Sequence, residues 1–102
     1  LIKSAKELEK KLISARVHTT DVFYRNADSD YYKELLREYN TIAVEMESFA
    51  LFHNAYILNK KAAALLTISD SFVSDKKTTA MERQLSFTDM VLIALNSIKY
   101  ID

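Results

Sequence analysis

The chain has 102 residues, of which 49% are hydrophobic and 27% charged, a composition typical of one small globular domain and not of a disordered or fibrous segment. Its 14 basic and 14 acidic residues cancel, so the net charge does not favour nucleic acid or an anionic membrane as a partner. The absence of cysteine excludes disulfides and thiolate nucleophiles, no apolar run is long enough to cross a bilayer, and we expect a cytosolic protein.

Seven segments alternate between helical and strand-like patterns along the chain. In order, these patterns predict a helix over residues 1–15, a strand over 16–24, a helix over 30–39, a strand over 41–46, a helix over 47–58, a strand over 61–69 and a helix from 79 to 98. The third strand, "KAAALLTIS", is rich in apolar residues, as in a strand buried on both faces of a parallel sheet. The αβαβαβα order predicts an α/β fold with a mostly parallel sheet, in which ligands bind beyond the carboxyl ends of the strands.

Apolar residues at intervals of three and four predict which helical faces are buried. The predicted buried positions are Leu1, Ala5, Leu8, Leu12 and Ala15 in the first helix, Phe49, Phe52 and Tyr56 in the third, and Phe87, Val91, Ala94 and Ile98 in the last. At the start of the last helix, Thr79 and Glu82 have the spacing of a capping box, which predicts where that helix begins.

Turns in this chain must form without glycine or proline, because the sequence contains neither. Asn40 and Asn59 each follow a helical pattern, and we expect them to take the left-handed conformation that glycine usually supplies there. A glycine-rich loop that binds phosphate is excluded within this chain, so any phosphate-binding groups must lie elsewhere.

Two glutamates, Glu45 and Glu47, lie close together in the apolar stretch "VEMESFALF". The pattern places Glu45 at the carboxyl end of a strand and Glu47 in the first turn of the next helix, at the edge where a ligand would bind. Sugar hydroxyls could satisfy both carboxylates by donating hydrogen bonds. Alternatively, Glu47 only complements the helix dipole and Glu45 points to water, and the spacing does not decide between the two readings.

A second candidate site lies in "TISDSF", where Ser69 and Asp70 end the third predicted strand. An aspartate in this place is typical of a catalytic acid and equally of a residue that only turns the loop. His18 and His53 have no partner at the spacing of metal ligands, so the sequence predicts no metal site.

Three motifs, "AVEMES", "TISDSF" and "TTAMERQLSFTDMVLIAL", follow one another in an order and spacing that resemble the carboxyl-terminal half of the bacterial hexameric type of purine nucleoside phosphorylase. The upstream "TDVFY" is similar to the strand that stacks on the base in that family, and the resemblance extends from about Val17 to Ile98. It implies a three-layer α/β/α fold with a mostly parallel sheet, and phosphorolysis of purine (2′-deoxy)nucleosides to the free base and (deoxy)ribose 1-phosphate. Phosphate would be a co-substrate, no cofactor would be needed, and the enzyme would be a homo-oligomer, a hexamer by resemblance.

The resemblance also implies roles for individual residues. Substrate-binding residues would be Phe23, Tyr24, Val44, Glu45, Met46, Glu47 and Ser69, and the catalytic residues would be Asp70 and Arg83. Phe23 would pack on the base, and Glu47 would hold the ribose hydroxyls. Asp70 would donate a proton to N7 of the purine with the help of Arg83, because a purine anion is a poor leaving group.

The chain also departs from the family pattern. Ala43 replaces the usual glycine, Ser71 replaces a histidine, and a Gly-Asn pair usual before the base-stacking strand is absent near Val17. The amino-terminal half, which carries the phosphate site in the family, is missing. We therefore expect residues 1–102 to be the carboxyl-terminal portion of a single phosphorylase domain, completed by a second half or chain.

The sequence leaves two other functions open. A nucleosidase of the methylthioadenosine/adenosylhomocysteine type has a similar Met-Glu and Ser-Asp layout but uses water, although "TTAMERQ" resembles the phosphorylase more closely. A non-catalytic fragment that binds a base or completes an oligomer is the other alternative. Phosphate-dependent release of hypoxanthine from inosine would separate the three functions.

Overall fold

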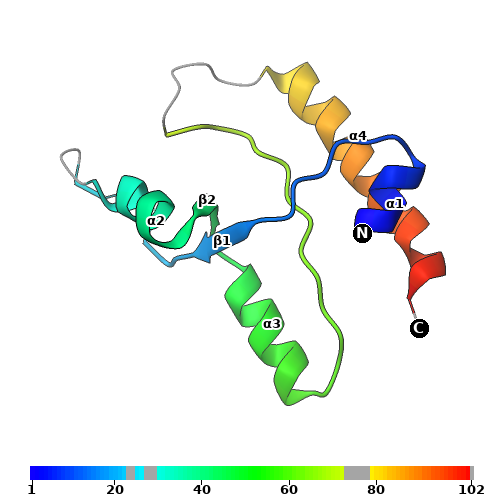
Figure 1. Cartoon of the computed structure of the whole chain (residues 1–102), viewed down its shortest axis with the longest axis horizontal. Helices are drawn as coiled ribbons and strands as arrows, with labels where there is room; N and C mark the ends of the chain where they lie inside the picture. The colour runs from blue at the N-terminus through cyan, green and yellow to red at the C-terminus, as the bar shows by residue number, and fades with distance from the viewer. Residues whose placement is uncertain (23–24, 27–29, 73–78, 102) are drawn as a thin grey trace. The chain divides into compact units, whose positions relative to one another are not determined.

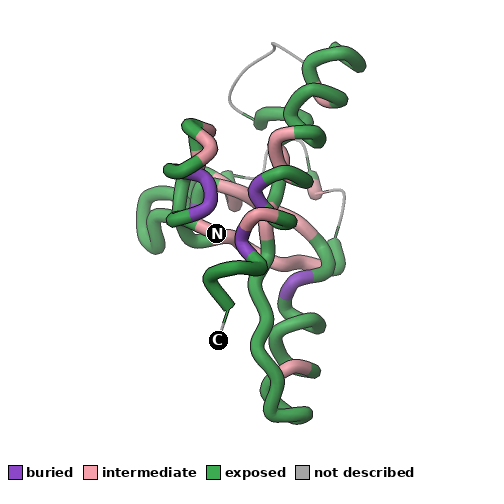
Figure 2. The backbone as a smooth tube through the Cα atoms, turned by 90° about the vertical axis from the view of Figure 1, so that its right-hand side faces the viewer, coloured by how far each residue is buried: buried purple, intermediate pink, exposed green. Residues whose placement is uncertain are grey.

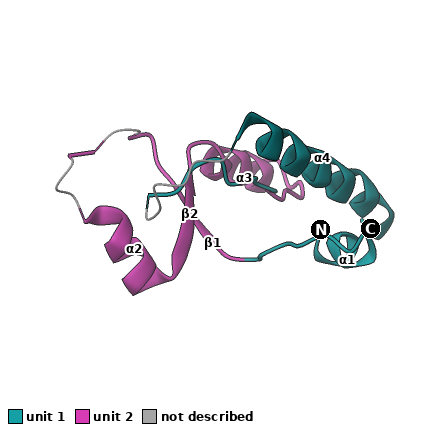
Figure 3. Ribbon diagram, turned by 90° about the horizontal axis from the view of Figure 1, so that it is seen from above, with its two compact units in different colours: residues 1–14, 65–102 teal, residues 15–64 magenta. Residues whose placement is uncertain are grey.

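The computed structural model describes residues 1–22, 25–26, 30–72 and 79–101 (Figure 1). The chain divides into two compact units, which are coloured separately in Figure 3. Unit 1 comprises residues 1–14 and 65–102, and unit 2 comprises residues 15–64. No helix among the described residues is long and apolar enough to span a membrane.

Unit 1 consists of a short first helix held against a long last helix. Its elements are α1 (Ile2–Glu7), α4 (Ala80–Asn96) and the 3-10 helix η1 (Ser97–Tyr100). Helix α4 begins with the predicted capping box: the Glu82 N–H donates to Thr79 Oγ1 at 3.1 Å, and the Thr79 N–H donates to Glu82 Oε2 at 3.4 Å. The core between α1 and α4 is small, with Ala5 and Ile93 as its buried apolar residues.

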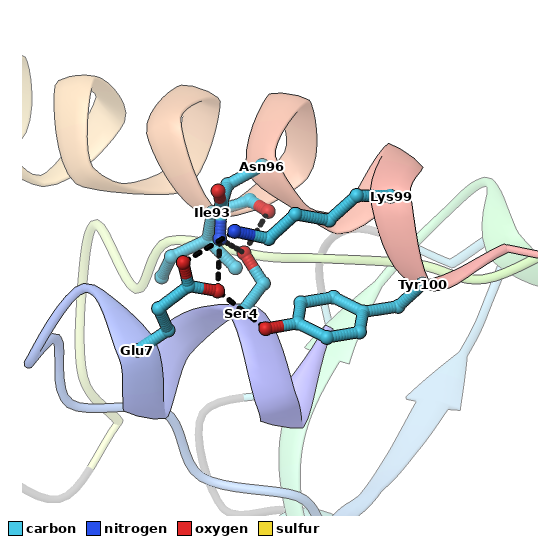
Figure 4. A network of polar contacts seen from close by, with 6 residues as sticks. All are labelled: Ser4, Glu7, Ile93, Asn96, Lys99 and Tyr100. Atoms are coloured by element: carbon cyan, nitrogen blue, oxygen red, sulfur yellow. Dashed lines mark hydrogen bonds and ion pairs between the residues drawn. The ribbon is translucent and has the colours of Figure 1, made fainter.

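A polar network joins α1 to the end of α4 and to η1 (Figure 4). The buried Ser4 hydroxyl donates to the Ile93 carbonyl at 2.7 Å and accepts from the Asn96 amide at 3.0 Å. Lys99 and Tyr100 both donate to the carboxylate of Glu7, which also accepts from Asn96 at 3.3 Å. These contacts fix α1 in place, since a helix of six residues has little stability of its own.

Unit 2 has the strand–helix–strand connection of an α/β fold, as the sequence predicts. Its elements are β1 (Arg16–Thr19), α2 (Tyr31–Tyr39), β2 (Thr41–Glu45) and α3 (Ser48–Ile57). The two strands pair in parallel, and their register sets Thr19 opposite Glu45 at the carboxyl ends of both strands. The Thr20 N–H extends the pairing by donating to the Glu45 carbonyl at 3.0 Å.

The helix ends confirm the two asparagine predictions and add a third position. Asn40 and Asn59 have φ values of 52° and 53°, in the left-handed region, after α2 and α3. Glu9 takes a φ of 55° after α1, so the first helix stops at Glu7 and not at residue 15 as predicted. The Lys10 N–H donates to the Ala5 carbonyl at 2.9 Å, which closes the helix end by the bond typical of a left-handed cap.

Strand β1 is shorter than the sequence predicts. It ends at Thr19, and the hydroxyl of Thr20 accepts a hydrogen bond from the Val22 N–H at 3.1 Å. Such a local side-chain bond favours a turn over continued strand pairing. Phe23 and Tyr24 lie outside the described residues, so their predicted place in this strand stays a prediction.

Residues 60–71 form neither helix nor strand, and the strand predicted over 61–69 is therefore wrong for this structure. A parallel strand needs neighbouring strands for its hydrogen bonds, and the two strands of the described sheet pair only with each other. The apolar pattern indicates that the segment suits a buried strand, but it does not supply the partners.

Two predictions of buried faces are also wrong (Figure 2). Phe87 and Val91 of α4 and Ile98 of η1 are exposed, whereas Ile93 of α4 and Ser97 of η1 are buried. On α3, Phe49 and Tyr56 are 70% and 82% exposed. Apolar spacing shows which residues favour burial, but burial also needs an opposing element, and these side chains remain exposed in the described part of the chain.

Candidate functional site

The junction between β2 and α3 places two candidate glutamates within three residues. Glu45 is the last residue of β2, and Glu47 is the N-cap residue of α3, in agreement with the predicted positions to within one residue. Val44 is partly exposed on β2, and Met46 is 38% exposed between the two glutamates. Residues 44–47 therefore lie together at the carboxyl end of a parallel strand, where α/β folds bind ligands.

Four hydrogen bonds converge on the carboxylate of Glu45. The hydroxyls of Thr19 and Ser48 donate to Oε1, the latter at 2.5 Å. The backbone N–H groups of Glu47 and Ser48 donate to Oε2 at 2.6 and 2.7 Å. The donors come from β1, from the junction and from α3, so one side chain connects three parts of unit 2.

These bonds set the charge of Glu45. Desolvation alone would raise its pKa, but the hydrogen bonds from Ser48 and Thr19 and from the two backbone N–H groups outweigh it and lower the pKa from 4.5 to about 2. Glu45 is therefore an anion at neutral pH.

Glu47 has a different environment. Its side chain is exposed, and Oε2 accepts a hydrogen bond from the Met46 N–H at 3.2 Å. No residue that the structure describes donates to its other carboxylate oxygen, and its side chain does not cap α3. The carboxylate is thus available to hydroxyl donors of a ligand.

The other candidate residues belong to unit 1. Ser69 and Asp70 are exposed and lie near the end of residues 60–71, which form neither helix nor strand, and Arg83 is partly buried in the first turn of α4. No ion pair joins Asp70 to Arg83 among the described residues. All three residues belong to unit 1, as does α4. Phe23 and Tyr24 lie outside the described residues.

A cavity of about 350 Å³ adjoins this part of unit 1. Its wall includes Lys11, Leu12, Thr67, Ile68, Asp89 and Met90. The Thr67 hydroxyl donates to the Met90 sulfur at 3.5 Å, and Lys10 pairs with Asp89 at 2.9 Å. Ile68 immediately precedes Ser69, so the chain passes directly from this wall to the candidate acid.

Sequence reasoning did not single out Thr19 and Ser48, which hold Glu45. Ser48 lies three residues after Glu45, a spacing across a helix start that could have indicated the contact. Thr19 offers no such local signal, because its place opposite Glu45 depends on strand register. The described residues contain no group of three His, Asp or Glu side chains that could hold a metal ion.

Comparison with known proteins gives consistent matches. The model of a family described as "Phosphorylase superfamily" matches residues 1–98. A relative from Oceanobacillus iheyensis named "Purine nucleoside phosphorylase DeoD-type" is 44% identical over 82 residues, which cover 80% of this chain and 34% of the relative. Proteins of the same name from Anoxybacillus flavithermus and Bacillus subtilis are 39% identical over 101 residues and 40% identical over 95 residues. They are matched over 95% and 93% of this chain, which spans 42% and 40% of their own lengths.

Proposed function

Because the chain belongs to the phosphorylase superfamily, we propose that it is the carboxyl-terminal part of a purine nucleoside phosphorylase. In this proposal it supplies the ribose-binding carboxylate and the acid that protonates the base. Its curated relatives carry the name of that enzyme, and the chain spans about a third to two fifths of their length. The activity thus belongs to a larger protein or complex.

One observation carries the ribose part of the proposal: the exposed, incompletely bonded carboxylate of Glu47 at the carboxyl end of a parallel strand. A carboxylate can accept hydrogen bonds from two neighbouring sugar hydroxyls, and bonds to a charged acceptor are about twice as strong as neutral ones. Met46, exposed beside it, offers an apolar surface to the sugar ring. Val44 lies in β2, two residues before Met46, on the base side of the proposed pocket.

The chemical step requires an acid at the base. A phosphate oxygen forms a bond to C1′ of the sugar while the bond from C1′ to N9 breaks, and the electron pair leaves with the purine. Asp70 donates its proton to N7 of that purine, Arg83 assists the aspartate, and Ser69 contacts the base beside it. Phe23 and Tyr24 pack against the base. Positioned proton donors typically contribute about 10² to 10⁴-fold in rate.

The phosphate site must come from outside this chain, which contains no glycine and hence no glycine-rich phosphate loop. Helix α3 supports a covering partner, because most of its side chains are apolar and Phe49 and Tyr56 are exposed. We assign this role to the remainder of a phosphorylase domain, within a homo-oligomer. Phosphate is then a co-substrate, no cofactor takes part, and the cytosol is the compartment that the sequence predicts.

The test is complementation. The chain is co-expressed with the part of the Oceanobacillus iheyensis relative that precedes the matched region, and release of hypoxanthine from inosine is measured with and without phosphate. We expect release only with phosphate and only with both parts present. Equal release without phosphate would indicate a nucleosidase, and no release from a stable complex would indicate a non-catalytic fragment.

The association of the chain with the added part of the phosphorylase domain is measured separately. Light scattering of the chain alone should show association or heterogeneity, because α3 is uncovered. A Phe49→Asp variant should weaken the complex with the added part, whereas Arg37→Asp on the exposed side of α2 should not. A monodisperse, folded monomer that does not bind the added part would contradict the proposal.

A further inference from the structure

We propose that Glu45 is a positioning residue, which fixes the junction of β2 and α3 and so orients Glu47, and that it does not itself bind the sugar. The inference rests on the proposed function in one respect only, which is that the sugar is the ligand of Glu47. It replaces the expectation that both glutamates contact substrate.

The Glu45 carboxylate has no free acceptor position for a sugar hydroxyl. An ionised carboxylate has about four lone-pair positions for hydrogen-bond donors. The Glu45 carboxylate already accepts two hydroxyls at Oε1 and two backbone N–H groups at Oε2. A sugar hydroxyl would have to displace one of these donors and leave it unpaired in a partly buried site, which is costly.

Glu45 also holds the start of helix α3. The N-cap side chain usually accepts a hydrogen bond from the N–H group of the second or third helical residue. In α3 the N-cap residue is Glu47, and its side chain makes no such bond. Glu45 accepts the N–H groups of the N-cap residue itself and of the first helical residue, Ser48, at 2.6 and 2.7 Å, and its negative charge lies at the positive end of the helix dipole. The start of α3 is therefore held without the Glu47 carboxylate, which is left for another ligand.

Glu45 is also linked to strand β1. The Thr19 hydroxyl donates to the same Glu45 oxygen as Ser48, and the two hydroxyl oxygens lie 3.1 Å apart. Thr19 and Glu45 are register partners, so this bond sets the end of β2 relative to β1. Because the backbone of Glu47 is bonded to Glu45, any shift of the Glu45 carboxylate moves the backbone that carries the Glu47 side chain.

The structural test uses the chain alone and does not depend on activity. The amide protons of Glu47 and Ser48 are followed by NMR and hydrogen exchange at neutral pH in wild type, Glu45→Gln and Thr19→Val. Glu45→Gln should shift both amide protons upfield and speed their exchange about tenfold or more, because a neutral amide replaces the charged acceptor. Thr19→Val keeps the carboxylate and both backbone bonds, and should change these two amides much less. Unchanged amides in Glu45→Gln would overturn the proposal.

Glu45→Asp covers the case in which Glu45→Gln does not fold. Aspartate restores the charge with a shorter side chain, and we expect it to recover part of the amide shifts and the folded state. A folded Glu45→Asp chain in which the amide protons of Glu47 and Ser48 exchange as fast as unprotected amides would show that the charge is not what holds the junction.

The functional test uses the complemented enzyme and a double-mutant cycle. Glu45→Gln should raise the KM for inosine about tenfold when Glu47 is present and have almost no further effect in a Glu47→Ala background, since it acts through that residue. An equal rise in both backgrounds would mean that Glu45 contacts the sugar directly and would overturn the proposal. If complementation gives no phosphorolysis, the proposed function fails, whereas the amide measurements still decide the role of Glu45.

Discussion

Thr19 and Glu45 lie opposite each other across two parallel strands, and the Thr19 hydroxyl donates a hydrogen bond to the Glu45 carboxylate. The bond joins residues 26 positions apart, from the end of β1 to the end of β2. It is one of the contacts that hold Glu45 in its ionised form.

Replacing Thr19 with valine should therefore raise the pKa of Glu45 from about 2 toward its ordinary value of 4.5. A lowered pKa stabilises the fold above pH 4.5, and that stabilisation is lost as the pH falls to about 2. The difference in unfolding free energy between wild type and Thr19→Val should be present at pH 6 and become smaller by pH 2. Urea unfolding at a series of pH values measures it, and a difference that grows toward pH 2 would contradict the assignment.

Glu47→Ala in the complemented enzyme should raise the KM for inosine by about 10- to 100-fold, because each hydrogen bond to a charged group contributes about 1.5–3 kcal/mol. Glu34→Ala, an exposed glutamate on α2, is the matched control and should leave KM unchanged. Steady-state kinetics with varied inosine would reveal the loss. A wild-type KM for inosine in Glu47→Ala would contradict the proposal that Glu47 binds the sugar.

Asp70→Asn should lower turnover of inosine by about two orders of magnitude or more, since an amide has no acidic proton to give to N7. The ring of 7-methylguanosine is already positively charged, so this substrate should escape most of the loss. Arg83→Ala should add little to Asp70→Asn if it acts through the aspartate. An equal loss of turnover for inosine and 7-methylguanosine would show that Asp70 does not protonate the base and is only a loop residue.

The Glu7 network should respond to acid. Bonds from Lys99, Tyr100 and Asn96 lower the pKa of Glu7 from 4.5 to about 2, so its contribution is complete above pH 4.5 and is lost as the pH falls to about 2. Glu7→Gln should speed amide exchange in α1 at pH 6 and have little effect near pH 2. Glu9→Gln, two residues away and exposed, is the control. Identical exchange in both variants at pH 6 would show that Glu7 does not hold α1.

Asn40→Ala should destabilise unit 2 by about 1–2 kcal/mol, because alanine is strained at a φ of 52°. Asn40→Gly should retain most of the stability, since glycine takes this conformation without a steric cost. Asn54→Ala lies within α3 and should not reproduce the loss. Chemical denaturation of the three variants separates a backbone effect from the loss of an amide side chain.

Local features of this fold could be predicted from the sequence. Asn40 and Asn59 were the natural left-handed positions in a chain without glycine, and Thr79 begins α4 with the predicted capping box. The glutamates of the candidate site were placed correctly at the junction of β2 and α3. Each of these features depends on residues within a few positions of one another.

Features that depend on distant partners could not be predicted. The apolar pattern over 61–69 suits a buried strand, but it does not show which strands would pair with it. The spacing of Phe49 and Tyr56 likewise predicts burial without saying what covers them. For the site, the saturation of Glu45 depends on its register with Thr19, which alternation along either strand alone does not set.

The polar network of α1 also affects the order in which the chain can fold during synthesis. Ser4 and Glu7 bond to Ile93 and Tyr100, which follow them by 89 and 93 residues. Unit 2 closes within residues 15–64. At roughly 5–20 residues per second on the ribosome, β1 and β2 can pair several seconds before the partners of α1 have been translated. A nascent α1 is therefore open to chaperones during that interval, and slower translation would lengthen it.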